Sequence, residues 1–168
     1  LKKITKNTAA VILETIQGGT GFIVPKDGYL KKVKQRCEKV GALLIVDEIQ
    51  TGIGRTGKFW GFEHFEIIPD IIISGKGLGG GMPIGAFIAQ KNLMDVLKEH
   101  PTLGHITTFG GHPVIASAGV ATVNTIQNST LIEDTLEKEQ LIRSLLKHPL
   151  IKEIRGKGLM LALIVESA

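Results

Sequence analysis

Three short apolar runs, each of which ends at polar residues, constrain the fold of this chain more than any other feature. The runs cover residues 9–13, 43–46 and 71–73, and the last consists of isoleucine alone. Continuous apolar runs of this length are typical of strands that are buried on both faces of a sheet. We therefore predict three strands in the interior of one sheet.

Predicted helices alternate with these strands. The segment from Asp27 to Gly41 has an apolar face formed by Leu30, Val33, Cys37 and Val40. Further helices are predicted at residues 92–100, 113–126 and 131–147, further strands at 85–89 and 159–165, and loops or turns at 51–65. The alternation predicts an α/β fold with a mostly parallel sheet and flanking helices.

Charge and cysteine content exclude several classes of protein. The 20 basic and 16 acidic residues give a net charge of +4, and only residues 31–36 form a basic cluster, on the exposed face of a predicted helix. We therefore expect no nucleic-acid partner. No apolar run reaches the roughly 20 residues of a membrane-spanning helix. With one cysteine, Cys37, and no signal-like segment, a cytoplasmic location is expected, without a membrane partner or a metal ion.

The composition changes near residue 128. Residues 133–139 are rich in charge, which predicts a domain boundary between residues 1–127 and 128–168; the alternative is one more surface helix of the same domain. The chain also lacks an initiator methionine and starts almost directly with a strand pattern. We therefore expect it to be a fragment of a longer protein.

The polar residues that follow the three apolar runs are Glu14, the pair Asp47-Glu48, and Lys76. Because the carboxyl ends of parallel strands meet at one edge of a sheet, these groups are expected to converge on one crevice. A lysine held partly out of water becomes a nucleophilic amine. Taken singly, Lys76 favours the interpretation of a solvated lysine after a core strand, and Asp47 that of a carboxylate that caps a nearby loop.

A lysine and an aspartate that face one ligand suit pyridoxal phosphate. The lysine binds the aldehyde, and the aspartate keeps the pyridine nitrogen protonated so that the ring accepts electrons. The segment 107–113 offers hydroxyl and backbone N–H groups before a predicted helix, which suits a phosphate group. An ordinary helix cap and turn is the alternative for that segment.

Four segments together resemble the class III pyridoxal-phosphate-dependent aminotransferases, closest to the acetylornithine and aminobutyrate types. The segments are residues 46–57, 69–86, 107–113 and 155–160. The resemblance implies the large domain of a fold-type-I transferase in residues 1–127 and the start of a small C-terminal α+β domain in residues 128–168. It also implies transfer of an amino group from an amine or ω-amino acid to a keto acid.

The resemblance also assigns roles to single residues. It makes Lys76 the Schiff-base lysine and proton carrier, Asp47 the partner of the pyridine nitrogen, and Gln50 a neighbour of the ring hydroxyl. Thr108 would bind the phosphate in the site of a second subunit, which implies a homodimer with shared active sites. Glu14 would support the ring or the substrate.

The chain departs from this family at several points. In the segment that begins at Glu14, Thr15 replaces a usual proline and Gly19 a usual glutamate, and His112 stands where asparagine is common. Because the usual glutamate is absent at position 19, the resemblance does not identify the substrate. The family's earlier phosphate loop, its ring-stacking aromatic residue and its C-terminal substrate arginine are also not found. We therefore expect this chain alone to bind cofactor poorly and not to turn over.

Other functions stay open at this point. A decarboxylating transaminase or an aminomutase would fit the same family. The spacing Gly75-x-Gly77-x-x-Gly80, with Asp95 further on, formally fits a dinucleotide-binding fingerprint, but that fingerprint requires a helix at the glycines. A non-catalytic interaction module is the third alternative.

Overall fold

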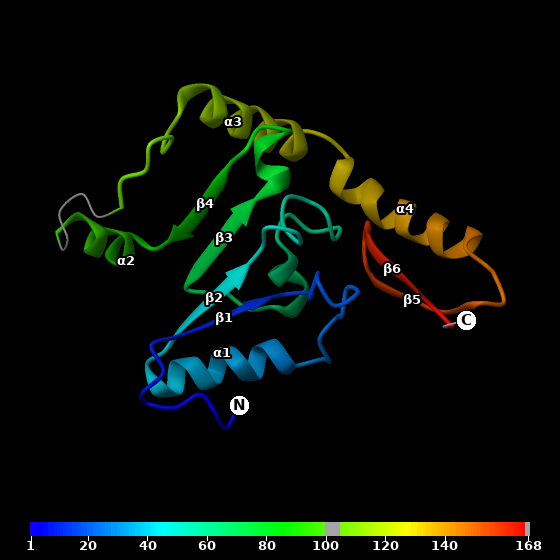
Figure 1. Cartoon of the computed structure of the whole chain (residues 1–168), viewed down its shortest axis with the longest axis horizontal. Helices are drawn as coiled ribbons and strands as arrows, with labels where there is room; N and C mark the ends of the chain where they lie inside the picture. Colours follow the sequence, from blue (N-terminus) through cyan, green and yellow to red (C-terminus); the bar gives the residue numbers. More distant parts are fainter. Residues whose placement is uncertain (100–104, 167–168) are drawn as a thin grey trace.

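The computed structural model of the protein describes residues 1–99 and 105–166 (Figure 1). Its centre is a four-stranded sheet of β1 (Ala10–Glu14), β2 (Leu43–Asp47), β3 (Ile71–Gly75) and β4 (Gly85–Ala89), in that spatial order. The first three strands are parallel, and β4 pairs with β3 in the antiparallel direction. The predicted strands and the mostly parallel sheet are therefore confirmed. The prediction that all three apolar runs lie in the interior is wrong for β1, which is an edge strand of the described sheet and has Ile12 62% exposed.

The hydrophobic core lies between this sheet and α1 (Tyr29–Val40). Leu30, Val33 and Cys37 of the helix are buried against Leu44 and Val46 of β2. Burial of each large aliphatic side chain contributes about 1.5–3 kcal/mol, so this contact is the main support of the sheet. The helix ends at Gly41, whose φ of 79° is the left-handed conformation that glycine adopts freely. The apolar face predicted from the sequence is confirmed.

Three α-helices follow β4 in the described part of the chain. They are α2 (Lys91–Asp95), α3 (Pro113–Gln127) and α4 (Leu131–Leu145). The predicted helix at residues 92–100 is too long, because α2 passes into a short 3-10 turn, η3 (Val96–Lys98); residue 100 lies outside the described residues. The region predicted as loops and turns contains one 3-10 helix, η1 (Gly61–Phe65).

The chain finishes in an antiparallel hairpin of β5 (Ile151–Lys157) and β6 (Met160–Val165). Figure 1 shows this hairpin and α4 as a lobe beside the sheet. Arg143 of α4 joins the two parts of the lobe, because its guanidinium donates to the carbonyl oxygens of Ile154 and, at 3.0 Å, Gly156. The sequence prediction missed β5, whose seven residues include four charged side chains and a glycine.

Among the residues that the structure describes, no helix has the length and apolar character needed to cross a membrane.

Candidate active site

The carboxyl edge of the sheet brings three of the predicted site residues together. Glu14, the last residue of β1, pairs with Asp47, the last residue of β2, and Asp47 pairs with Ile73 of β3. Lys76 follows β3 directly and opens the 3-10 turn η2 (Lys76–Gly79). The three residues therefore share one edge of the sheet, as parallel topology predicted, but of the three only Lys76 lines the cavity found there.

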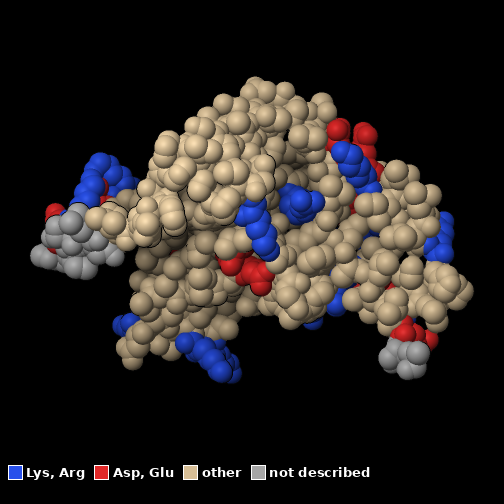
Figure 2. All heavy atoms as spheres, turned by 45° about the horizontal axis from the view of Figure 1, so that its top comes forward, with Lys and Arg blue, Asp and Glu red and all other residues tan. Residues whose placement is uncertain are grey.

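A cavity of about 280 Å³ lies at this edge and is lined by both Lys76 and Gln50. Phe22, Ile53 and Met160 belong to its apolar wall. Among the described residues, its lining contains two cationic side chains, Lys76 and Arg55, and no acidic one. Figure 2 shows basic side chains at a hollow near the middle of one face, beside a patch of acidic side chains. A cavity of this charge favours an anionic ligand.

The backbone around this cavity is unusual. Phe22, Ile53 and Lys76 all line it, and their φ angles are 53°, 57° and 41°. Non-glycine residues rarely adopt positive φ, and a β-branched residue such as Ile53 does so at a cost of about 1–3 kcal/mol. Of the described non-glycine residues, only Glu66 also has positive φ. Backbone strain that is concentrated in this way is typical of functional sites.

The structure corrects one expectation for Lys76. Its side chain is exposed rather than held partly out of water. The reason is its surroundings: η2 continues as Gly77, Leu78 and Gly79, and two of these three residues have no side chain to cover the lysine. The amine is therefore freely accessible from solvent in this chain.

Asp47 lies half-buried beside the cavity but not in its lining. Its Oδ1 atom accepts a hydrogen bond of 2.9 Å from the backbone N–H of Ile49. Its Oδ2 atom accepts none from the described part of the chain. One carboxylate oxygen is thus used to fix the side chain, and the other is left for a ligand.

Glu14 and Gln50 are linked through Gly18. The backbone N–H of Gly18 donates to Oε2 of Glu14 at 2.8 Å. A Cβ atom placed on Gly18 would lie 2.5 Å from Oε1 of Gln50, so the loop lies directly against the amide of that side chain. Glu14 therefore holds the loop that contacts Gln50, and the carboxylate itself is not in the lining of the cavity.

Glu48 does not face the crevice, contrary to the prediction. It is fully buried, and its carboxylate accepts hydrogen bonds from the backbone N–H groups of Gly61 and Phe62, both at 2.8 Å. Consecutive side chains of a strand point to opposite faces, so an outward Asp47 requires an inward Glu48. Burial raises the pKa of Glu48 above its ordinary value. Thr15, a position where the sequence departs from the expected pattern, contacts the same carboxylate at 3.2 Å.

Thr108 lies elsewhere in the chain. It is exposed in the turn before α3 and does not line the cavity at Lys76. Its neighbours Thr107, Gly110 and His112 line a second cavity of about 310 Å³, together with residues of the segment that enters β4. The structure therefore does not bring Thr108 and Lys76 of one chain into a common pocket.

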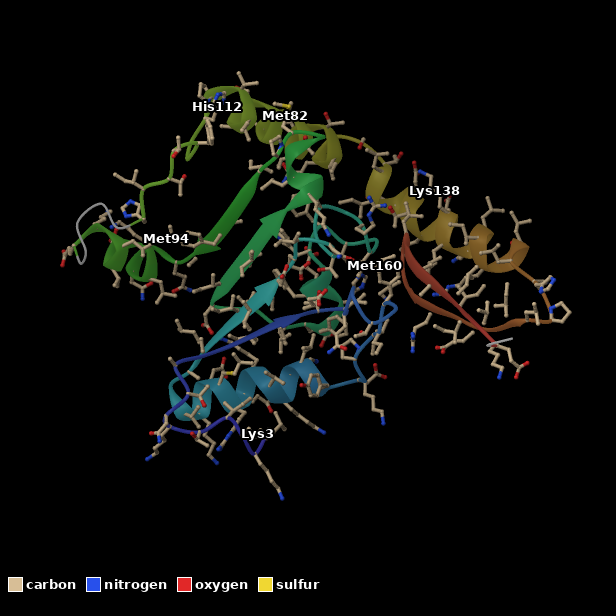
Figure 3. The ribbon with its side chains drawn as sticks, in the orientation of Figure 1. Lys3, Met82, Met94, His112, Lys138 and Met160 are labelled. Carbon is tan, nitrogen blue, oxygen red and sulfur yellow. The ribbon has the colours of Figure 1, made fainter. Side chains whose placement is uncertain are left out.

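The sequence analysis missed the part of the wall that comes from the C-terminal lobe. Leu159 and Met160 line the cavity, and the backbone N–H of Leu159 donates to the carbonyl oxygen of Arg55 at 3.0 Å. Figure 3 shows Met160 between the hairpin and the loops at the edge of the sheet. Arg155 of β5 donates to the carbonyl oxygen of Gly21 at 2.8 Å. Residues 155–160 resemble the aminotransferase family, which marked this segment as a candidate. The resemblance did not indicate where the segment packs.

The dinucleotide-binding alternative does not fit the structure. The glycines at 75, 77 and 80 run from β3 through the four-residue turn η2 towards the strand β4, so the required helix is absent from this described segment. Asp95 forms surface ion pairs with Lys91 and Lys98.

Comparison with known proteins identifies close relatives. The family profile described as aminotransferase class-III matches residues 1–168. An acetylornithine aminotransferase from Methanopyrus kandleri is 41% identical over 166 residues, which cover 98% of this chain and 42% of that protein. The structure of an acetylornithine aminotransferase from Elizabethkingia anophelis has a TM-score of 0.88 at 41% identity, and the match covers 96% of this chain and 41% of that one.

A third relative is the ornithine aminotransferase from Toxoplasma gondii, in a structure whose active site holds pyridoxal phosphate at partial occupancy. Its TM-score is 0.86 at 41% identity, with 96% of this chain and 39% of that chain covered. The chain thus spans about two fifths of the length of these relatives.

Proposed function

Because this chain belongs to the class-III aminotransferase family, we propose that it is the lysine-bearing part of a pyridoxal-phosphate-dependent aminotransferase. The enzyme would move an amino group from an amine or ω-amino acid to a keto acid. The α/β fold expected for a fold-type-I transferase is confirmed by solved structures of the family, with TM-scores of 0.86 and 0.88. The observation that carries the proposal is Lys76, held at positive φ after β3 on a cavity shared with Gln50.

The residues present fit the cofactor. When bound, pyridoxal phosphate supplies an aldehyde that condenses with amines and a ring that takes up electrons. Lys76 offers an accessible primary amine, Gln50 an amide on the same cavity, and Asp47 the carboxylate oxygen that no described residue uses. Asp47 would hold the proton of the pyridine nitrogen, and Gln50 would contact the ring hydroxyl.

Lys76 would also carry the proton in the transfer. As a free amine, its Nζ atom would accept a proton from the substrate carbon that bears the amino group, and as an ammonium it would deliver that proton to the C4′ carbon of the cofactor. This role requires a mobile side chain near the reacting atoms. The exposed position of Lys76 leaves its Nζ atom free to move in this way.

Several finer assignments belong to the same proposal. Thr108 would bind the phosphate group in the site of a second subunit, which makes the enzyme a homodimer with shared sites. Its exposure, and its separation from the cavity of its own chain, support this role. Glu14 would act by holding the loop at Gly18. We also propose a cytoplasmic location and a large-domain boundary between residues 127 and 128.

The test is covalent trapping of the cofactor on Lys76. Purified protein is mixed with pyridoxal phosphate, its visible spectrum is recorded, and borohydride is added before the labelled peptide is identified by mass spectrometry. In the wild type we expect the trapped cofactor on the peptide that contains Lys76. In Lys76→Ala we expect this labelled peptide and the visible band to be lost. The control is Lys91→Ala, since the side chain of Lys91 is 83% exposed on α2. Equal labelling of wild type and Lys76→Ala would refute the assignment.

Turnover is a separate question, because the chain spans about two fifths of its relatives. We expect the purified 168-residue chain to bind cofactor weakly and to show no transamination. Robust amino transfer by this chain alone would show that the residues present suffice.

A further inference from the structure

We propose that Glu48 is a positioning residue: its buried carboxyl group fixes the turn that carries Asp47 and Gln50. The consequence for cofactor binding rests on the function proposed above. The structural part of the proposal, that this carboxyl group sets the geometry of the turn, is independent of that function.

The carboxyl group of Glu48 joins its own turn to two other segments of the chain. Thr15 lies just after β1, Thr51 lies in the turn after β2, and Gly61 and Phe62 belong to η1. Thr51 donates to Oε2 at 2.6 Å, and the hydroxyl groups of Thr15 and Thr51 are 3.0 Å apart. Glu48, Thr15 and Thr51 are all fully buried, so these hydrogen bonds are protected from water.

The backbone of Glu48 is fixed on both sides as well. Its N–H group donates to the carbonyl oxygen of Ile73 in β3 at 2.8 Å, and its carbonyl oxygen accepts from Gly52 at 3.0 Å. The side chain of Glu48 is therefore held by Thr15, Thr51 and η1, and its backbone carbonyl closes the turn from residue 48 to residue 52. Asp47 precedes this anchor, and Gln50 lies inside the closed turn.

The chemistry of the surroundings explains why the anchor is a carboxylate. Both backbone partners, Gly61 and Phe62, are donors, and they bind different oxygen atoms. An amide in place of the carboxylate would turn its NH₂ group towards one of these N–H groups and leave that donor unpaired. An unpaired buried donor costs about 1–3 kcal/mol. Glu48 forms none of the ion pairs found among the described residues, so its hydrogen bonds are its main compensation for burial.

The first experiment measures amide hydrogen exchange on the full chain without cofactor. The reporters are the N–H groups of Ile49, which donates to Asp47, and of Gly52, which donates to Glu48. Glu48→Gln is expected to accelerate their exchange about tenfold relative to the amides of α1, because the opening is local and not global.

Two threonine variants make this test decisive. Thr15→Val removes one hydroxyl group from the Glu48 cluster and keeps the side-chain shape. Thr135→Val removes the hydroxyl group of another buried threonine, in α4, where it donates to the carbonyl oxygen of Leu131 at 2.8 Å. We expect faster exchange at Ile49 and Gly52 in Thr15→Val and no change there in Thr135→Val. If Glu48→Gln fails to fold, Thr15→Val decides. Equal protection in both threonine variants would overturn the proposal.

The second experiment titrates the same variants with pyridoxal phosphate and follows the Lys76-dependent visible band. Thr15→Val and Glu48→Gln are expected to weaken binding measurably, by about threefold to tenfold, with Thr135→Val at the wild-type level. A wild-type protein without any Lys76-dependent band would refute the proposed function, and the exchange data would still decide the role of Glu48. Wild-type affinity in Glu48→Gln would overturn its positioning role.

Discussion

The backbone of Gly18 lies against the side-chain amide of Gln50, so closely that a Cβ atom on Gly18 would be 2.5 Å from Oε1 and 2.8 Å from Cδ. No real Cβ contact is this short, so any other residue at position 18 must displace the amide. Glu14 keeps this arrangement in place through its hydrogen bond to the N–H group of Gly18. The position of Gln50 is thus set by a residue with no side chain.

The first prediction concerns this contact. Gly18→Ala is expected to weaken pyridoxal-phosphate binding severalfold, because it moves the Gln50 amide out of place. Its free energy of unfolding should fall by less than about 1 kcal/mol, since the colliding atoms are the end of a flexible side chain. Gly19→Ala is the matched control, because a Cβ atom there would meet nothing within 4 Å. Equal affinity of the two variants in a spectroscopic titration would contradict the prediction.

The second prediction concerns the strained backbone at Lys76, whose φ is 41°. Lys76→Gly should be more stable than Lys76→Ala by about 1 kcal/mol, because only glycine adopts positive φ without steric cost. Both variants should fail to form the borohydride-stable label. Urea unfolding of the two variants measures the difference. An alanine variant as stable as the glycine variant would show that the backbone at this position is unstrained.

The third prediction tests how the C-terminal hairpin packs. A Cβ atom on Gly158 would lie 2.6 Å from the carbonyl oxygen of Arg55 and 2.6 Å from Cα of Thr56. Backbone atoms cannot move aside, so Gly158→Ala should lower the free energy of unfolding by about 2 kcal/mol or more. Gly28→Ala is the control that carries the backbone strain without the steric collision. Its φ is also positive, at 72°, but a Cβ atom there would meet no described atom within 4 Å. Equal losses in the two variants would mean that the hairpin does not pack there.

The fourth prediction follows from His64, whose Nε2 atom lies 3.0 Å from the carbonyl oxygen of Thr56. Burial and, to a smaller extent, the positive charge of Lys157 lower the pKa of His64 below its ordinary value of 6.5 in the folded protein. The unfolded chain therefore binds a proton first as the pH falls below 6.5, and the free energy of unfolding decreases until the folded-state pKa is reached. Above pH 6.5 the residue is neutral in both states and contributes no slope.

The measurement compares wild type with His64→Gln in urea unfolding at about pH 7.5 and about pH 5.5. The glutamine amide can still donate to Thr56 but does not titrate. The loss of stability between the two pH values should be smaller in the variant. An identical loss in both proteins would assign the pH dependence to other groups.

The sequence predicted the strands well because each parallel strand begins with a continuous apolar run and α1 has a clear apolar face, but it could not show that β1 lies at the sheet edge. The same reasoning missed β5, where Lys152, Glu153 and Arg155 interrupt the apolar pattern. That strand is held by its partner β6 and by Arg143 of α4. These are tertiary contacts, which no local pattern contains.

Only part of the candidate site could be predicted, because the sequence pattern shows where strands end but not how loops pack. Glu14, Asp47 and Lys76 follow apolar strands, so their common edge could be predicted from parallel topology. The direction of Glu48 was predicted wrongly, because two adjacent carboxylates were assigned to one crevice although strand alternation separates them. Phe22 and Ile53 could not be predicted as wall residues, because their positive φ angles come from packing and not from residue type.

Leu159 and Met160, which form part of the cavity wall, are synthesised after the other residues that line the cavity. A ribosome makes Gln50 and Lys76 long before it makes the hairpin that completes their cavity. During that interval the nascent chain presents an accessible lysine amine on an unfinished surface. The cavity can reach its final shape only after the hairpin has packed against Arg55, so the cavity wall is completed late in the synthesis of this chain.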